Sequence, residues 1–176
     1  MRTAIVTDSN SGIFEQEGEK IGIRVIPMPV IIDGKTYYEG KDLSHREFFQ
    51  LLEEGHQVSS SQPSLEDIQE TWEKLFAQGY EEIVHIPMSS GLSGSYQSAR
   101  MLAGKYDGRV QVADNHRISV TLRQSVEEAL SLARQGHTAL RIKEVLEKKA
   151  LDAIIFVGVE TLKYLKKGGR ITPAAA

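Results

Sequence analysis

The sequence predicts an α/β fold in which helices flank a mainly parallel sheet. Short runs rich in Ile, Val or Phe alternate with longer stretches of helical periodicity, which is typical of parallel strands joined by crossover helices. Residues that cap helices or form turns stand at the boundaries between the two kinds of segment. The chain has 176 residues, 40% of them hydrophobic, so it is long enough to bury one core.

The predicted strands are short and apolar. In chain order they cover residues 3–7, 24–27, 82–86, 110–113 and 152–157. Such runs are typical of strands that are buried on both faces of a sheet. A further β-prone stretch, residues 30–38, contains an Asp33-Gly34 turn and therefore predicts a small hairpin.

The predicted helices alternate with these strands and are amphipathic. They cover residues 44–54, 64–78, 93–106, 121–135 and 138–149. Ser64 and Thr138 stand at two of the starts, where a side-chain oxygen can accept a hydrogen bond from an unpaired backbone N–H. Gly79 and Gly136 follow two of the helices and favour the left-handed conformation that ends a helix.

The composition argues against several classes of function. With 21 basic and 24 acidic residues the net charge is −3, which offers no general attraction to nucleic acid or to an anionic membrane. The absence of cysteine excludes disulfides, thiolate metal sites and cysteine nucleophiles. The histidines lack the spacing of metal ligands, so no metal is expected. The first apolar run, residues 3–6, is too short for a signal peptide or a membrane span, so we expect a cytoplasmic protein without a transmembrane segment.

A loop dense in serine and glycine follows the third predicted strand. It reads Ser-Ser-Gly-Leu-Ser-Gly-Ser from Ser89 to Ser95 and leads into a helix. Backbone N–H groups and the positive end of the helix dipole converge at such a place, and serine hydroxyls add donors. The loop therefore predicts a site for an anion, with a simply capped helix as the alternative. It lacks the signatures of a P-loop and of a dinucleotide-binding turn, which argues against a nucleotide.

Two further polar loops can contribute to the same site. Asp8 and Ser9 follow the first strand, and Ser60 and Ser61 precede the helix that starts at Ser64. Ligands of open α/β sheets bind beyond the carboxyl ends of the strands, so we expect the three loops to meet at one rim. Taken singly, each loop is also explained as a turn or a cap.

A catalytic reading of these residues is weaker. Ser93, His85 and Asp114 could form a triad, but His85 lies inside a predicted strand and no Gly-x-Ser-x-Gly elbow is present. Asp8 is the best single carboxylate, either as a functional group or as the cap of the loop that follows it.

The C-terminal segment combines basic residues with glycines. Lys166, Lys167 and Arg170 flank Gly168-Gly169 and form a patch that could steer an anion or lie in a solvated loop. Residues 172–176, with Pro173, predict the first turn of a helix. Because one turn is not stable alone, we expect residues 1–150 to form an α/β lobe and residues 151–176 to begin a second, incomplete α/β lobe.

Four motifs stand in order along nearly the whole chain: Thr7-Asp8-Ser9, Ser60-Ser61-Gln62-Pro63-Ser64, Ser89-Ser90-Gly91-Leu92-Ser93-Gly94-Ser95-Tyr96 and Leu165-Lys166-Lys167-Gly168-Gly169-Arg170-Ile171. In these motifs the chain resembles the DegV family of bacterial fatty-acid-binding proteins. The resemblance implies a two-lobed carrier, without a cofactor or an ATP site, that buries a long-chain fatty acid and presents its carboxylate to polar residues. It also implies a separate fatty acid kinase subunit that phosphorylates the bound acyl chain, a step of phospholipid metabolism.

The resemblance also assigns roles to residues of the serine-rich loops. Ser60 and Ser93 match the positions that contact the carboxylate, with Ser60 standing where the family usually has threonine, and Ser61 adjoins them. Gly94 and Ser95 are expected to supply neighbouring backbone amides.

Outside those loops, Asp8 and Ser9 form a supporting loop, and Arg170 with Gly169 matches a motif at the head-group mouth or the kinase-docking surface. The chain departs from the family at Asp114-Asn115-His116, where Asp-Ser is usual, and at residues 120–124, where small residues are usual. The family's second lobe also supplies a head-group histidine, and no residue of this chain fills that role.

The leading hypothesis is therefore a fatty-acid carrier and not an enzyme. Its apolar tunnel is expected to be lined by residues drawn from Ile26, Met28, Val30, Ile31, Phe156 and Leu162. One alternative is a small α/β enzyme that acts on a phosphorylated or carboxylate substrate through Asp8 and the serine loops. Another is a folded fragment that is inactive or dimerises through an exposed edge.

Overall fold

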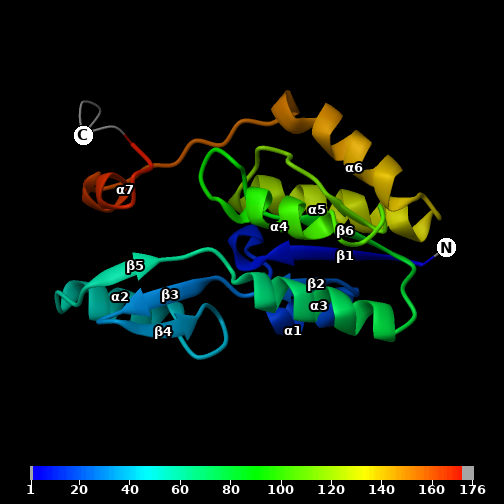
Figure 1. Ribbon diagram of the computed structural model, residues 1–176. Helices are drawn as coiled ribbons and strands as arrows, with labels where there is room; N and C mark the ends of the chain where they lie inside the picture. The colour runs from blue at the N-terminus through cyan, green and yellow to red at the C-terminus, as the bar shows by residue number, and fades with distance from the viewer. Residues whose placement is uncertain (1, 172–176) are drawn as a thin grey trace.

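A computed structural model describes residues 2–171 of the chain, and its main sheet is parallel throughout (Figure 1). The strand order is β2-β1-β6-β7, with bounds β1 Thr3–Asp8, β2 Arg24–Ile26, β6 Glu82–Ile86 and β7 Val110–Val112. Ile5 lies opposite Val84 in the central pair, and Val84 lies opposite Gln111 in the next. The predicted α/β class and these four strands are confirmed.

Helices cover both faces of this sheet. Their bounds are α1 Glu15–Ile21, α3 Leu65–Ala77, α4 Ser95–Ala103, α5 Ser119–Arg134 and α6 Ala139–Lys148. Successive strand residues point to opposite faces: Ile5 and Val84 pack among residues of α5 and α6, whereas Val6 and Ile83 pack with Trp72 among residues of α3 and α4. This alternation explains why the central strands contain almost only apolar residues.

Two of the helix predictions are supported by their caps. The hydroxyl of Ser64 accepts a hydrogen bond from the Asp67 N–H, and the Asp67 carboxylate accepts one from the Ser64 N–H. Thr138 accepts from the Arg141 N–H. Helix α1 is not among the sequence-based predictions, because its seven residues include Gly18 and only one strongly apolar residue.

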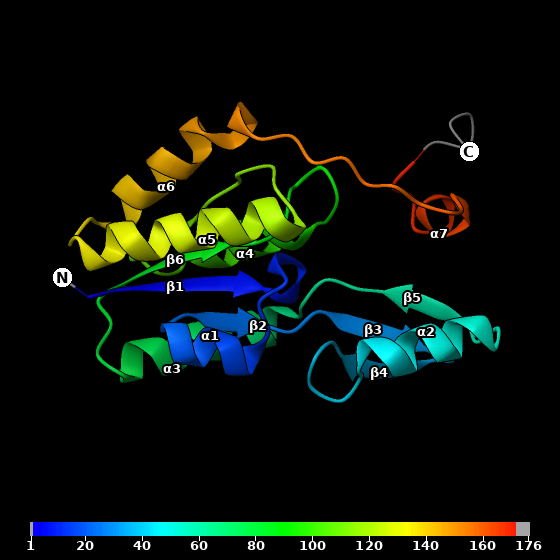
Figure 2. The ribbon, with the colours of Figure 1, turned by 180° about the vertical axis from the view of Figure 1, so that it is seen from behind.

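A second, antiparallel sheet lies beyond the carboxyl ends of the main strands (Figures 1 and 2). Its order is β4-β3-β5, with β3 Pro29–Ile32, β4 Lys35–Tyr38 and β5 Val58–Ser60, and α2 His45–Glu53 lies between β4 and β5 in sequence. Asp33 and Gly34 have φ values of 49° and 81°, as a tight hairpin turn requires. The hairpin is thus confirmed, and β5 is an addition that its Ser-Ser sequence did not indicate.

The predicted strand over residues 152–157 is wrong. Residues 150–152 form a short 3-10 turn, and residues 153–160 have no regular structure. Phe156 is 92% exposed, and within residues 2–171 no neighbouring strand supplies hydrogen bonds to this segment. A β-prone run becomes a strand only when a partner is available.

After residues 153–160, the chain forms a short helix beside the small sheet (Figure 2). Helix α7 covers Lys163–Lys167, and the Lys167 ammonium donates to the Gln57 side chain at 3.2 Å and to the Val58 carbonyl at 3.4 Å. The helix turn predicted for residues 172–176 lies outside the described residues. None of the helices within residues 2–171 is long and apolar enough to cross a bilayer.

Candidate functional site

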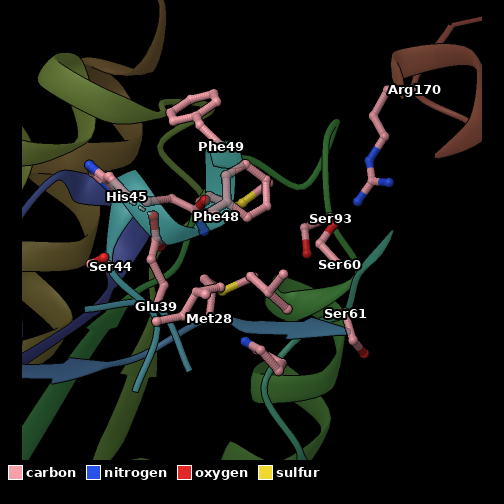
Figure 3. A pocket seen from close by; sticks show the side chains of 15 residues that line it. Met28, Glu39, Ser44, His45, Phe48, Phe49, Ser60, Ser61, Ser93 and Arg170 are labelled. Atoms are coloured by element: carbon pink, nitrogen blue, oxygen red, sulfur yellow. Dashed lines mark hydrogen bonds and ion pairs between the residues drawn. The ribbon is translucent and has the colours of Figure 1, made fainter. Parts of the chain in front are cut away.

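A pocket of about 310 Å³ lies where the small sheet and α2 meet the loops after β1 and β6 (Figure 3). Most of its wall is apolar and comes from Met28, Pro29, Val30, Leu43, Phe48, Phe49 and Met88. Its polar lining consists of Asn10, Glu39, Ser44, His45, Ser60, Ser61, Ser93 and Arg170. An apolar chamber with a few polar groups is typical of sites for amphipathic small molecules.

A second hollow of about 600 Å³ adjoins the first between α2, β5 and α7. The two share the lining residues Val30, Phe48, Phe49, Ser60 and Arg170. Leu52, Val58 and Tyr164 extend the apolar surface of the second hollow. Apolar space therefore continues from the Ser60 region along α2.

The Ser89–Ser95 loop brings the Ser93 side chain to the pocket. The Ser93 N–H donates to the Ser89 carbonyl at 3.2 Å, which folds the loop back on itself. The hydroxyls of Ser93 and Ser95 lie 2.8 Å apart, and the Ser95 N–H donates to the Ser93 hydroxyl at 3.1 Å. Ser95 is buried and orients Ser93. Its amide, expected to face a ligand directly, is directed to Ser93 in this structure.

The neighbouring loop brings Ser60 and Ser61 to the same pocket. Ser60 ends β5 opposite Val30, and the Ser61 N–H donates to the Pro29 carbonyl at 3.1 Å. The two serine-rich loops are joined by Gln62, whose amide donates to the Ser98 hydroxyl in α4 at 2.8 Å. A side chain at Gly94 would have its Cβ only 2.5 Å from Gln62 Oε1. The absence of a side chain at Gly94 therefore lets the loops approach.

Asp8 and Ser9 support the pocket from outside its lining. Asp8 is buried and accepts hydrogen bonds from the backbone N–H groups of Asn10 and Met88, at 3.0 and 2.9 Å. Burial raises the pKa of Asp8, and these hydrogen bonds offset part of that rise. The resulting pKa is about 6. The Ser9 hydroxyl donates to Glu39 at 2.5 Å and accepts from the Met28 N–H at 3.0 Å. The two residues thus connect four residues of the pocket lining, Asn10, Met28, Glu39 and Met88.

Arg170 lies at the mouth shared by both hollows. Its guanidinium donates to the Gly168 carbonyl at 2.9 Å and points toward Ser60 and Ser93 (Figure 3). Gly169, at φ 70°, provides the turn that brings the side chain back. No acidic side chain within residues 2–171 forms an ion pair with Arg170. Its charge is therefore available at the mouth.

The triad considered from the sequence is not assembled. His85 is buried in β6, edge-on to Trp72, and burial lowers the pKa of its imidazole to about 3. Asp114 instead accepts from the backbone N–H of Ser90 at 3.3 Å. Within the described part of the chain, no three His, Asp or Glu side chains are placed to hold a metal ion.

Several pocket residues were not identified from the sequence. Asn10, Glu39, His45, Phe48 and Phe49 all line the pocket. The strongly amphipathic pattern of α2 is the signal that could have indicated Phe48 and Phe49, of which Phe49 is 57% exposed. Of the expected tunnel residues, Met28 and Val30 line the pocket, whereas Ile26 lies in the main core and Phe156 and Leu162 are exposed.

Comparison with known proteins places this architecture in a family. The model described as "Uncharacterised protein, DegV family" matches residues 2–176. The DegV domain-containing protein lin2658 of Listeria innocua is 35% identical over 99% of this chain and 62% of its own length. A DegV domain-containing protein of Deinococcus radiodurans is 32% identical over 100% of this chain and 63% of its own length.

Solved structures give the same result. The chain superposes on a solved structure described as "Fatty Acid Binding of a DegV family Protein from Thermus thermophilus". The TM-score is 0.88 and the sequence identity 32%, and the match covers 99% of this chain and 62% of that one. A stearic acid-binding protein from Eubacterium ventriosum gives a TM-score of 0.80 and 27% identity, with coverages of 99% and 62%. The chain thus spans about three-fifths of the length of these relatives. Because the family model matches residues 2–176 and the fold agrees with the solved structures, the chain belongs to the DegV family.

Proposed function

We propose that this chain binds a long-chain fatty acid, with the carboxylate at the serine-rich loops and the tail in the apolar pocket. The observation that carries the proposal is that Ser60 and Ser93, from two separate loops, line one chamber whose other walls are apolar. The matched structures from Thermus thermophilus and Eubacterium ventriosum are described as binding a fatty acid and stearic acid, which supports the same ligand class here.

The chemistry of the pocket suits such a ligand. Each buried methylene contributes roughly 0.8 kcal/mol to binding, and Met28, Val30 and Phe48 supply the surface for it. A carboxylate accepts hydrogen bonds only, so the hydroxyls of Ser60 and Ser93 act as donors to it, with Ser61 beside them. Hydrogen bonds to an ionised group are stronger than neutral ones.

The neighbouring residues have supporting roles in this proposal. Ser95 orients the Ser93 hydroxyl, and Gly94 allows Gln62 to connect the loops. Arg170, on the turn formed by Gly169, contributes a positive charge at the mouth for the head group or for a partner. Asp8 and Ser9 act indirectly, through the loops that they hold.

The role that fits this site is a carrier. A cytoplasmic fatty acid kinase subunit would phosphorylate the exposed head group, as a step of phospholipid metabolism, and the carrier would need no cofactor. Residues 1–150 form the α/β lobe in this proposal, and residues 151–176 begin the second lobe. The exposed apolar side chains of Ile154, Phe156 and Val157 support this division, because a second lobe would cover them.

An enzyme that uses Asp8 has less support. Asp8 is 1% exposed and does not line the pocket. Its carboxylate is already occupied by donors from Asn10 and Met88. A substrate in the pocket would have no direct contact with it.

Native mass spectrometry and titration calorimetry with oleate test the proposal. We expect wild-type protein purified from bacteria to carry fatty acid, and the Ser60→Ala/Ser93→Ala variant to bind oleate on the order of 100-fold more weakly, since two hydrogen bonds to a charged group are lost. Ser131→Ala, on the exposed face of α5, is the matched control and should bind as wild type does. Absence of binding by the wild type, or unchanged binding by the double variant, contradicts the proposal.

A further inference from the structure

A second group of polar side chains lies at the end of the pocket away from Ser60 and Ser93. Figure 3 shows Glu39, Ser44 and His45 on one side and Ser60 and Ser93 on the other. Met28 and Phe48 lie between the two groups in the same view. The pocket is therefore an apolar chamber with a polar group at each end.

The Glu39 carboxylate is part of the pocket wall. One of its oxygens accepts the Ser9 hydroxyl at 2.5 Å, and the other lies 3.4 Å from His45 Nε2. The Glu39 side chain is 28% exposed, against 65% for His45. A carboxylate has about four acceptor positions, so Glu39 keeps capacity for a further donor from the pocket.

The strand register gives the separation of the two ends. The Glu39 N–H donates at 3.0 Å to the carbonyl of Met28, the residue before β3, on the side of β4, and Ser60 lies opposite Val30 on the other edge of β3. Two residues along β3 and two strand spacings across it place the two backbones about 12 Å apart. With carbon–carbon bonds of about 1.5 Å in a zigzag chain, roughly ten carbons span that distance.

We infer that Glu39 is a specificity-determining residue, which makes this pocket accept an acyl chain with a hydroxyl about ten carbons from the carboxylate and reject one with a second carboxylate there. The inference rests on the proposed function. A hydroxyl donates to Glu39 and replaces the water that the tail displaces, whereas a second carboxylate meets a like charge in a partly desolvated wall. The same charge fixes the direction of the ligand, because the head group is attracted by Arg170 and repelled by Glu39.

Calorimetric titration with dodecanoate, its ω-hydroxy derivative and its ω-carboxy derivative tests the inference, at a pH where all the carboxyl groups are ionised. We expect wild-type protein to bind the hydroxy acid at least as tightly as dodecanoate, and the dicarboxylate on the order of 10- to 100-fold more weakly. In Glu39→Gln, which keeps an acceptor for Ser9, the penalty on the dicarboxylate should fall to within about threefold of dodecanoate. Glu66→Gln, an exposed carboxylate on α3, should keep the wild-type order.

The possible results separate the two proposals. If wild-type protein binds all three ligands equally, or if Glu39→Gln keeps the discrimination, the inference about Glu39 is wrong and fatty-acid binding stands. If wild-type protein binds none of the three, nor oleate, both proposals are wrong.

Discussion

The carboxylate of Asp8 accepts a hydrogen bond of 2.9 Å from the backbone N–H of Met88. This contact joins the end of β1 to the residues that follow β6, just before the loop that carries Ser93. Since Met88 also lines the pocket, a buried acid at the sheet edge influences the shape of the site without touching its contents.

Asp8 should make stability depend on pH. Burial raises its pKa from 3.8 to about 6, so between these values the native state holds a proton that the unfolded state has released. The contribution of Asp8 is thus fully present below about pH 4 and is lost as the pH rises to about 6, up to about 3 kcal/mol. Asp8→Asn should remove this dependence, measured as free energies of unfolding in urea across that range. An unchanged pH profile would contradict the assignment.

His85 should have the opposite effect. Burial lowers its pKa from 6.5 to about 3, so the unfolded state binds a proton first, and stability present above about pH 6.5 is lost as the pH falls towards 3. Phenylalanine can keep the edge-on contact with Trp72 and removes Nδ1, which has no hydrogen-bond partner in the part of the chain that the structure describes. Thermal melts of His85→Phe should show a gain over wild type that grows on acidification. A constant difference at all pH values would sink this prediction.

Gly94→Ala should weaken fatty-acid binding through Gln62. The added Cβ would lie 2.5 Å from Gln62 Oε1, so Gln62 must move and its hydrogen bond to Ser98 is strained or lost. We expect roughly fivefold weaker oleate binding, the equivalent of one ordinary hydrogen bond. Gly91→Ala is the control, since its Cβ makes an ordinary contact of 3.5 Å with the Ser89 hydroxyl. Equal effects of the two variants would argue against a role for the Gly94–Gln62 approach.

Arg170→Met should weaken oleate binding and reduce its dependence on salt. The guanidinium lies at the mouth of both hollows, and salt screens a charge that attracts the head group. Affinities of wild type and variant, measured at low and high ionic strength, should converge at high salt. Arg100→Met, which removes an exposed cation of α4, should keep the wild-type salt dependence. A variant with the full wild-type salt dependence would show that Arg170 does not act on the ligand by charge.

Local sequence patterns were sufficient to predict the main sheet and most of its helices. Alternating apolar runs and amphipathic stretches are local patterns, and burial on both faces leaves a central strand such as β1 little choice of residue. Capping at Ser64 and the Asp33-Gly34 turn are also local, because the atoms that form them lie within a few residues of one another. The rule that loops after parallel strands share an edge accounts for the proximity of the loops after β1 and β6. It does not account for the Ser60–Ser61 loop, which follows β5 of the antiparallel sheet.

Contacts between segments that are distant in sequence could be identified only from the folded chain. Residues 152–157 have strand-like composition, but no strand of the described residues 2–171 pairs with them, whereas the Ser-Ser sequence of β5 is a strand because β3 pairs with it. Glu39 became a pocket residue through its position across β3 from Ser60, which depends on the register of two strand pairs. Local propensity is encoded in neighbouring residues, but pairing and pocket chemistry depend on contacts between segments far apart in sequence, which no local pattern specifies.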